Sequence, residues 1–204
     1  MKKTENQFIV MDADTFAEWL KDQKIGRTIK RIQNHHTWKP DYSNFRGDNH
    51  FNLLNGMRNS HLKRGFSDIA QNLTTFPDGT VGVCRPLSRT PAGIKGANTG
   101  GICIEHIGNF DEGKDQMSEE HMNTVIKLNA VLCTKFELVP DTDTVVYHHW
   151  WDLNSGRRKD GEGITKSCPG TAFFGGNKVA NAREHFIPKI KTLLEETQTD
   201  AACA

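Results

Sequence analysis

Two histidine pairs and one cysteine are the residues of this sequence whose types could together hold a metal ion. His35-His36 ends one strand-like segment, His148-His149 ends another, and Cys168 lies in a Ser-Cys-Pro-Gly loop. Zinc in catalytic sites takes three protein ligands, commonly from His, Cys and carboxylates, and keeps one position for water. Two imidazoles and one thiolate fit that pattern, so these residues predict a zinc site. Each piece alone is a weak signal, because a lone histidine pair or a buried cysteine more often only packs.

Strand ends and a loop must bring these residues together. Apolar segments at residues 27–36 and 145–148 predict the strands that carry the histidine pairs. Segments rich in glycine at residues 85–100 and 154–176 predict long loops, which are often functional when ordered. The other expected elements are a helix capped by Asp14, a helix capped by Asn49, strands at residues 67–76 and 80–84 joined by a tight turn, a strand at residues 102–104, a helix capped by Ser118, and a last helix from about Val179 that Pro188 kinks. Helices and strands alternate only partly, which predicts an α/β fold with a mixed central β-sheet flanked by helices.

Composition excludes several classes of protein. The 204 residues include 26 basic and 25 acidic side chains, so a strongly electropositive nucleic-acid binder is not expected. No apolar run approaches the roughly 18–20 residues of a membrane span, and the amino-terminal segment lacks the apolar core of a signal peptide. We therefore expect a protein made in the cytoplasm without a secretion signal. The odd number and wide scatter of the cysteines argue against a disulfide framework and for mostly reduced thiols; they are Cys84, Cys103, Cys133, Cys168 and Cys203.

Six motifs in order give the sequence a family resemblance. They are Ile-Gln-Asn-His-His-Thr-Trp at residues 32–38, Arg-Gly-Phe-Ser-Asp-Ile-Ala at 64–70, Phe-Pro-Asp-Gly-Thr at 76–80, Gly-Ile-Cys-Ile-Glu-His-Ile-Gly-Asn-Phe-Asp at 101–111, Val-Val-Tyr-His-His at 145–149 and Lys-Ser-Cys-Pro-Gly at 166–170. Together they resemble the type-2, zinc-dependent N-acetylmuramoyl-L-alanine amidases, a family that includes amidase-type phage lysozymes and peptidoglycan-recognition proteins. The resemblance covers about residues 25–175. It implies the amidase and peptidoglycan-recognition fold, with residues 1–204 as a single amidase domain whose terminal helices flank this core.

The resemblance implies one zinc ion per chain, held by His35, His148 and Cys168. Strand register favours His148 over His149 as the second ligand, and His149 stays open as an alternative. His36 is then expected to pack or hydrogen-bond behind the metal.

Two further residues are candidates for catalysis of amide hydrolysis. Glu105, in the turn after a short strand, is the candidate general base that takes a proton from water and returns it to the leaving amine. The alternative is an exposed glutamate at a strand end. The resemblance implies that Lys166, two residues before Cys168, stabilises the developing oxyanion, and the alternative is a solvated loop lysine.

Four residues are candidates for binding a glycan with a peptide stem. Trp38, together with Trp150 and Trp151, could stack on sugar faces, although large aromatic side chains more often lie in the core. Gln71 occupies the place where many family members have a tyrosine near the metal, and it could donate a hydrogen bond. Arg85 and Asn98 lie on the loop where the family's groove runs, and they could bind peptide carbonyls or carboxylates.

The resemblance therefore implies a zinc-dependent hydrolase that cleaves the amide bond between N-acetylmuramic acid and L-alanine in peptidoglycan. We expect an endolysin-like enzyme of a phage or prophage that reaches the cell wall after release through a holin or by lysis. The alternatives are a cytosolic amidase that recycles muropeptides and a non-catalytic peptidoglycan-recognition module. The second alternative predicts loss of the metal ligands, and the presence of Cys168 disfavours it. The sequence leaves the oligomeric state and the stem-peptide specificity open.

Overall fold

A mixed sheet runs through the centre of the computed structural model, which describes the backbone of residues 2–203 and the side chains of residues 2–197 and 199. Its strand order is β1-β2-β5-β4-β6-β3-β7. The strands are β1 (Lys2–Glu5), β2 (Phe8–Asp12), β3 (Arg31–His36), β4 (Leu73–Thr75), β5 (Thr80–Val83), β6 (Gly101–His106) and β7 (Val145–Tyr147). The β1, β2, β5 and β4 neighbours pair antiparallel, whereas β4-β6, β6-β3 and β3-β7 pair parallel. The predicted mixed α/β architecture is confirmed.

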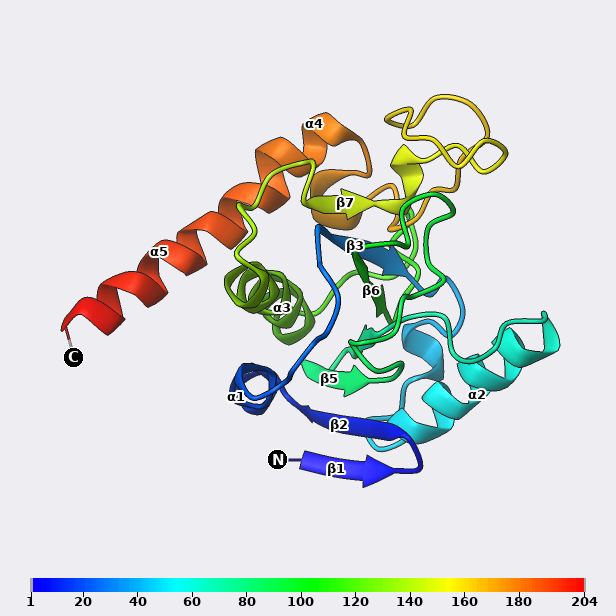
Figure 1. The fold of residues 1–204 in the computed structure, drawn as a ribbon. Helices are drawn as coiled ribbons and strands as arrows, with labels where there is room; N and C mark the ends of the chain where they lie inside the picture. Colours follow the sequence, from blue (N-terminus) through cyan, green and yellow to red (C-terminus); the bar gives the residue numbers. More distant parts are fainter. Residues whose placement is uncertain (1, 204) are drawn as a thin grey trace.

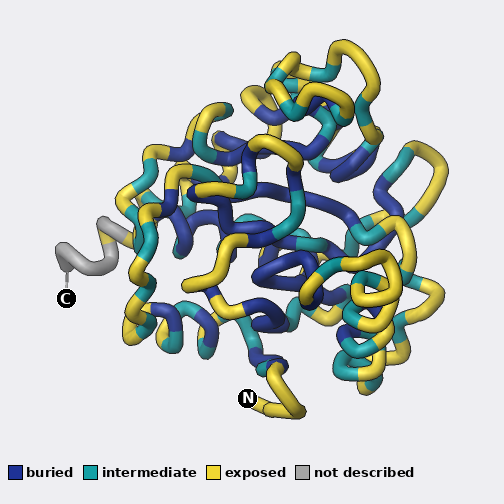
Figure 2. Tube along the Cα trace, turned by 45° about the vertical axis from the view of Figure 1, so that its right-hand side comes forward, coloured by how far each residue is buried: buried dark blue, intermediate teal, exposed yellow. Residues whose placement is uncertain are grey.

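Helices cover both faces of this sheet, with α1, α3 and α5 on one side and α2 on the other (Figure 1). The helices are α1 (Ala13–Lys21), α2 (His50–Lys63), α3 (Glu119–Phe136), α4 (Val179–Asn181) and α5 (Ile187–Cys203), with short helical turns at Tyr42–Asn44, His148–Trp150, Phe173–Gly175 and Ala182–Phe186. Side chains alternate along each strand, so β2 sends Met11 into the α1 and α3 core and Phe8 and Val10 into the α2 core. The central strands are buried and exposure concentrates in the loops (Figure 2).

The parallel half of the sheet positions the chemistry. Strands β3 and β6 are buried along almost their whole length, as expected for parallel strands covered on both faces. Their register places Gln33 opposite Cys103 and His35 opposite Glu105. Because these strands are parallel to each other and to β7, their carboxyl ends meet at one edge of the sheet. That edge is where open α/β sheets place their ligands.

Helix α3 begins as its sequence predicts. The Ser118 side chain accepts a hydrogen bond from the His121 backbone N–H at 3.2 Å, and Glu119 and Glu120 fill the first turn. Buried Val125, Leu128 and Leu132 face the sheet. Strand β4 and strand β5 also contact this helix, so α3 fixes one wall behind the parallel strands.

Three expected local features are wrong or incomplete. The cap of α1 is Asp12, not Asp14, because Asp12 lies three residues before Thr15 and accepts its backbone N–H at 2.7 Å. Helix α2 follows Asn49 as expected, but the Asn49 side chain makes no cap bond and instead accepts from the Arg46 N–H at 2.9 Å. Of the strand expected at residues 67–76, only Leu73–Thr75 pairs in the sheet.

The carboxyl-terminal helical region bends before Pro188. Residues Ala182–Phe186 form a π-helical turn between α4 and α5, and the Ile187 N–H reaches back to the Ala182 carbonyl. Proline has no N–H to donate to the preceding turn, so a wider turn just before it is a physical consequence of this residue.

The described cysteine side chains are free thiols, as expected; they are Cys84, Cys103, Cys133 and Cys168. The side chain of Cys203 lies outside the described residues. Within residues 2–203, no helix combines the length and apolar character that crossing a membrane requires.

Candidate metal centre

The carboxyl ends of β3 and β7 bring two histidine side chains together, with their rings in an edge-on arrangement. His35 is the fifth residue of β3, and His148 begins the short helical turn that follows β7. Their Nδ1 atoms lie 3.2 Å apart, and both side chains are buried. Cys168 reaches the same place from its loop, and one ligand atom from each of the three residues lies within 4.8 Å of the others. The sequence-predicted ligand set therefore forms one buried cluster.

The neighbouring residue of each histidine pair points elsewhere. His149 Nδ1 lies 2.8 Å from the Lys166 carbonyl oxygen, outside the cluster, because the chain leaves the strand geometry after Tyr147 and turns. His36 alternates to the opposite face of β3, where its Nδ1 accepts from the Phe110 N–H at 3.2 Å. His36 thus orders the segment that follows β6.

The Cys168 loop is held from both sides. The Asp111 carboxylate accepts from the Ser167 hydroxyl at 3.0 Å and from the Thr171 N–H at 3.1 Å. A Cβ at Gly170 would lie 2.3 Å from the Phe110 carbonyl oxygen, so only glycine allows this close backbone approach. These contacts fix the sulfur without relying on the metal.

The protonation states of the cluster suit a divalent cation. Burial lowers the pKa of His35 well below its usual value and lowers the pKa of His148 to about 3, so both imidazoles are neutral with a free lone pair. Burial raises the pKa of the Cys168 thiol, and a bound cation supplies the charge that favours its thiolate form. His35 Nε2 is also buried, and no described residue forms a hydrogen bond with it. Two neutral imidazoles and one thiol that a cation deprotonates fit zinc.

Glu105 lies beside this cluster on the neighbouring strand. Its Oε1 is 3.8 Å from His35 Nδ1, and its side chain is 19 % exposed. Burial raises its pKa to about 8, against an opposing effect of the Lys166 charge. Glu105 is therefore a partly accessible carboxyl group that can exchange a proton close to neutral pH.

Lys166 is exposed on the Cys168 loop, and its positive charge acts on the pKa values of residues in and beside the cluster. Burial is the main cause of the lowered pKa of His148, and the Lys166 charge lowers it further. The same charge also lowers the pKa of Glu105, against the larger raising effect of burial. The structure thus brings the two predicted catalytic residues to the predicted ligands. Their roles stay predictions.

Residues 25–171 match the profile of a protein family described as N-acetylmuramoyl-L-alanine amidase. The chain belongs to this family. The match spans the whole cluster, from the strand that carries His35 to the loop that carries Cys168. No curated protein matches the chain.

Solved structures share the fold of this amidase family member at low identity. An endolysin N-acetylmuramoyl-L-alanine amidase, LysCS from Clostridium intestinale, is 21% identical with a TM-score of 0.56, covering 83% of this chain and 85% of its own. Drosophila peptidoglycan recognition protein PGRP-LB is 17% identical with a TM-score of 0.58, covering 78% and 82%. Peptidoglycan recognition protein-LE, solved with tracheal cytotoxin, is 22% identical with a TM-score of 0.56, covering 72% and 76%. These likenesses confirm the amidase and peptidoglycan-recognition fold.

Two of the four predicted substrate-binding residues, Gln71 and Arg85, are buried in the structure. Gln71 is fully buried, and its amide nitrogen donates to the Thr74 hydroxyl at 3.1 Å. The Arg85 guanidinium is buried and donates to the Ile69 and Thr90 carbonyls at 2.7 and 2.9 Å. Arg85 thus ties two loop carbonyls together, whereas Gln71 bonds side chains of its own surroundings.

The other two candidates remain accessible. Trp38 follows His35 by three residues and is 59% exposed, so its ring is accessible to a ligand. Asn98 is half-buried and its Oδ1 accepts from the Ile94 N–H at 2.9 Å, so it shapes its own loop. Trp150 and Trp151 are both buried in the core, which is the alternative expected from the sequence for large aromatic side chains.

The two long loops beside the cluster touch each other. A Cβ at Gly96 would lie 1.9 Å from the Gly156 carbonyl oxygen, so the two main chains are in direct contact. Next to this contact, Lys95 Nζ donates to the Asn154 carbonyl at 2.7 Å. Residues 85–100 and 151–166 are therefore in direct contact with each other.

Sequence reasoning missed Cys103 and Gln33. Cys103, His35 and Glu105 form a second group whose ligand atoms lie within 4.8 Å of one another, and Gln33 is fully buried beside them. The signal was available, since residues two apart on a strand share a face.

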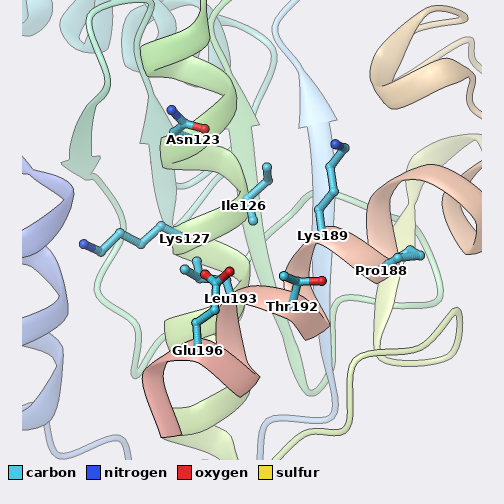
Figure 3. A pocket seen from close by; sticks show the side chains of 8 residues that line it. All are labelled: Asn123, Ile126, Lys127, Pro188, Lys189, Thr192, Leu193 and Glu196. Carbon is cyan, nitrogen blue, oxygen red and sulfur yellow. The ribbon is translucent and has the colours of Figure 1, made fainter. Parts of the chain in front are cut away.

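A separate groove of about 510 Å³ lies between α3 and α5 (Figure 3). Its walls come from surface side chains of the two helices, among them Ile126, Lys127, Leu193 and Glu196. None of the cluster residues lines it, so it has no part in the chemistry described above.

Proposed function

We propose that this chain is a zinc-dependent N-acetylmuramoyl-L-alanine amidase that hydrolyses the amide bond between N-acetylmuramic acid and L-alanine in peptidoglycan. The observation that carries the proposal is the buried meeting of His35, His148 and Cys168, with Glu105 beside them, in a member of this family. We take residues 1–204 as one amidase domain, because the terminal helices pack on the same core as the sheet.

His35, His148 and Cys168 would hold the zinc ion in a buried position. His35 and His148 present neutral Nδ1 atoms, and Cys168 presents its sulfur from an anchored loop. When bound there, zinc polarises the scissile carbonyl as a Lewis acid and makes water more acidic.

Glu105 is the proposed proton carrier. As a carboxylate it takes a proton from the attacking water while the oxygen bonds to the carbonyl carbon. As a carboxylic acid it then gives this proton to the alanine nitrogen when the carbon–nitrogen bond breaks. Burial raises its pKa to about 8, so near neutral pH both the carboxylate and the acid form are populated, one for each half of the step.

Lys166 is the proposed stabiliser of negative charge on the carbonyl oxygen. Its ammonium group is exposed, yet its charge acts on the pKa of both His148 and Glu105. A positive charge at this place favours the transition state, in which the oxygen becomes anionic, over the neutral ground state.

The substrate class is peptidoglycan or a soluble muropeptide. The exposed Trp38 ring, three residues after His35, can lie against a sugar face. Support for the ligand class comes from peptidoglycan recognition protein-LE, whose structure holds a monomeric diaminopimelic acid-type peptidoglycan. We propose action on the cell wall after release of the protein, and the endolysin amidase neighbour supports this site of action.

Incubation with purified peptidoglycan and, separately, with soluble muropeptides tests the function. Mass spectrometry of the products should show stem peptides with a free amino-terminal L-alanine and intact glycan strands. The Cys168→Ser variant is the control that should release none. Products from muropeptides alone would identify a recycling amidase, and binding to peptidoglycan without products would identify a recognition module.

A further inference from the structure

Gln33 and His35 lie next to each other on one face of β3, and each has a buried polar atom without a partner. The Gln33 amide nitrogen donates to the Ala97 carbonyl at 2.8 Å, which fixes Oε1 as the other end of the amide. Among the described residues, Gln33 Oε1 and His35 Nε2 both lack a hydrogen-bond partner. Gln33 is fully buried and His35 is 2% exposed, so bulk water does not satisfy either atom.

Gly93 shows that these two atoms face the same point. A Cβ built on Gly93 would lie 2.7 Å from Gln33 Oε1 and 3.0 Å from His35 Nε2. The Cys103 sulfur is also 2.7 Å from that position. A second glycine, Gly101, makes room for the other end of the amide, because its Cβ would lie 2.5 Å from the Gln33 nitrogen. The chain thus keeps space for the Gln33 side chain behind the imidazole.

A neutral imidazole carries one proton, so the two ring nitrogens of His35 have different roles. His35 Nδ1 faces His148 Nδ1 at 3.2 Å, on the side of the ligand cluster. A neutral imidazole that offers its lone pair at Nδ1 carries its proton at Nε2. That N–H needs an acceptor, and an amide oxygen is a far better acceptor than the neighbouring thiol.

We propose that Gln33 is a positioning residue that accepts the His35 Nε2–H, directly or through one water molecule, and thereby fixes Nδ1 as the metal-binding atom. Gly93 leaves the space that this interaction needs, because a Cβ there would lie close to both atoms. The inference rests on the proposed metal site, and it adds a residue that acts on the metal only through His35. Partners of this kind typically contribute about 10–100-fold to metal affinity.

Gln33→Met tests the proposal, because methionine fills a similar volume without an amide oxygen. We expect zinc affinity, measured by chelator competition, to fall by roughly 10–100-fold. NMR should show the His35 Nε2 proton protected from exchange in the zinc-loaded wild type and unprotected in the variant. Gln71→Met is the matched control, since Gln71 is also fully buried with an unpartnered Oε1 but has no contact with His35. Its zinc affinity and its His35 proton should match the wild type.

Gly93→Ala provides a second test that leaves Gln33 in place. The added methyl group must displace the amide oxygen, the imidazole or the thiol, so zinc affinity should fall here too. Combining it with Cys103→Ala relieves one of the three clashes and should restore part of the affinity. Gly56→Ala is the control, because a Cβ at Gly56 meets nothing within 4 Å.

The outcomes separate this inference from the proposed function. Wild-type zinc affinity and an unchanged His35 proton in Gln33→Met would overturn the role of Gln33. If the wild type itself binds no zinc, the proposed metal site fails. The full chain without zinc then still tests Gln33, since the wild type should hold His35 in the Nε2–H form and Gln33→Met should not.

Discussion

The two faces of the sheet differ in hydrogen bonding where β3 and β6 end. On the α3 face, every ring nitrogen of His106 and His121 has a partner. Tyr42 Oη lies 2.8 Å from His121 Nδ1, Thr75 Oγ1 lies 2.6 Å from His121 Nε2 and 2.7 Å from His106 Nδ1, and His106 Nε2 lies 3.0 Å from Asn34 Oδ1. On the other face, His35 Nε2 and Gln33 Oε1 have no partner within the part of the chain that the structure describes.

One assignment of protons satisfies the whole α3-face chain. Tyr42 donates to His121, His121 donates to Thr75, Thr75 donates to His106, and His106 donates to Asn34. Both histidines are then neutral, in agreement with the lowered pKa of each. Burial alone therefore does not mark a histidine as a ligand. The difference lies in whether its lone pairs are already used.

On the sheet face that carries His35, the largest effect is expected from replacing a proposed metal ligand. Cys168→Ser should reduce bound zinc from about one ion per chain to near zero and abolish hydrolysis, since a neutral hydroxyl is a poor zinc ligand. Elemental analysis of the purified protein gives the metal content. Cys133→Ser, at a buried cysteine of α3, should keep its zinc. Equal metal content in Cys168→Ser would refute the ligand set.

Glu105→Gln should retain zinc while turnover falls by roughly 10²–10⁴, the usual contribution of general acid–base catalysis. The amide is nearly isosteric but carries no titrating proton, so the corresponding limb of the pH–rate profile should disappear. Glu112→Gln, on the exposed loop after β6, is the matched control and should be fully active. Weaker zinc binding with an unchanged profile would mean that Glu105 only orients His35.

Lys166→Ala should keep its zinc and lose about 10²–10³ in turnover, the range for one group that stabilises an oxyanion. Lys159→Ala, an exposed lysine of the adjoining loop, supplies the comparison and should remain near wild type. Steady-state kinetics on soluble muropeptides measures both. Normal turnover in Lys166→Ala would mean that Lys166 is a solvated loop lysine with no role in catalysis.

On the α3 face, where the histidines already have hydrogen-bond partners, acid should lower the stability of the fold. Burial lowers the pKa of His121 from 6.5 to about 3, so between these values the unfolded chain binds more protons than the folded one. Stability therefore falls as the pH drops through this window, by about 2 kcal/mol from His121 at about pH 5. Urea unfolding at about pH 7 and about pH 5 should show a loss smaller by about 2 kcal/mol in His121→Gln. An equal loss in both proteins would show that folded His121 already takes up its proton.

Local patterns allowed much of the fold and the cluster to be predicted. The Ser118 cap and the apolar strands before His35 and His148 are short-range features, and their positions followed from neighbouring residues. The family motifs then indicated which histidines and which cysteine would meet.

The burial of Gln71 and Arg85 could not be predicted in this way. Each polar side chain is covered because the segment at residues 66–72 packs against residues 85–92, and no local pattern encodes that contact. Backbone bonds show the same packing, with the Ala92 N–H donating to the Ala70 carbonyl at 3.0 Å. An irregular buried segment and a strand have similar compositions, so the expected strand over residues 67–72 failed for the same reason.

The main-chain contact between Gly96 and Gly156 has a consequence for building hybrid enzymes. A side chain on Gly96 would collide with the carbonyl of Gly156, so a foreign sequence in either loop must reproduce the bare backbone of its partner. The loops at residues 85–100 and 151–166 should therefore be exchanged together in a hybrid enzyme. Transplanting the pair together preserves the frame around the cluster, whereas transplanting one loop alone would push the segment that carries Lys166 out of place.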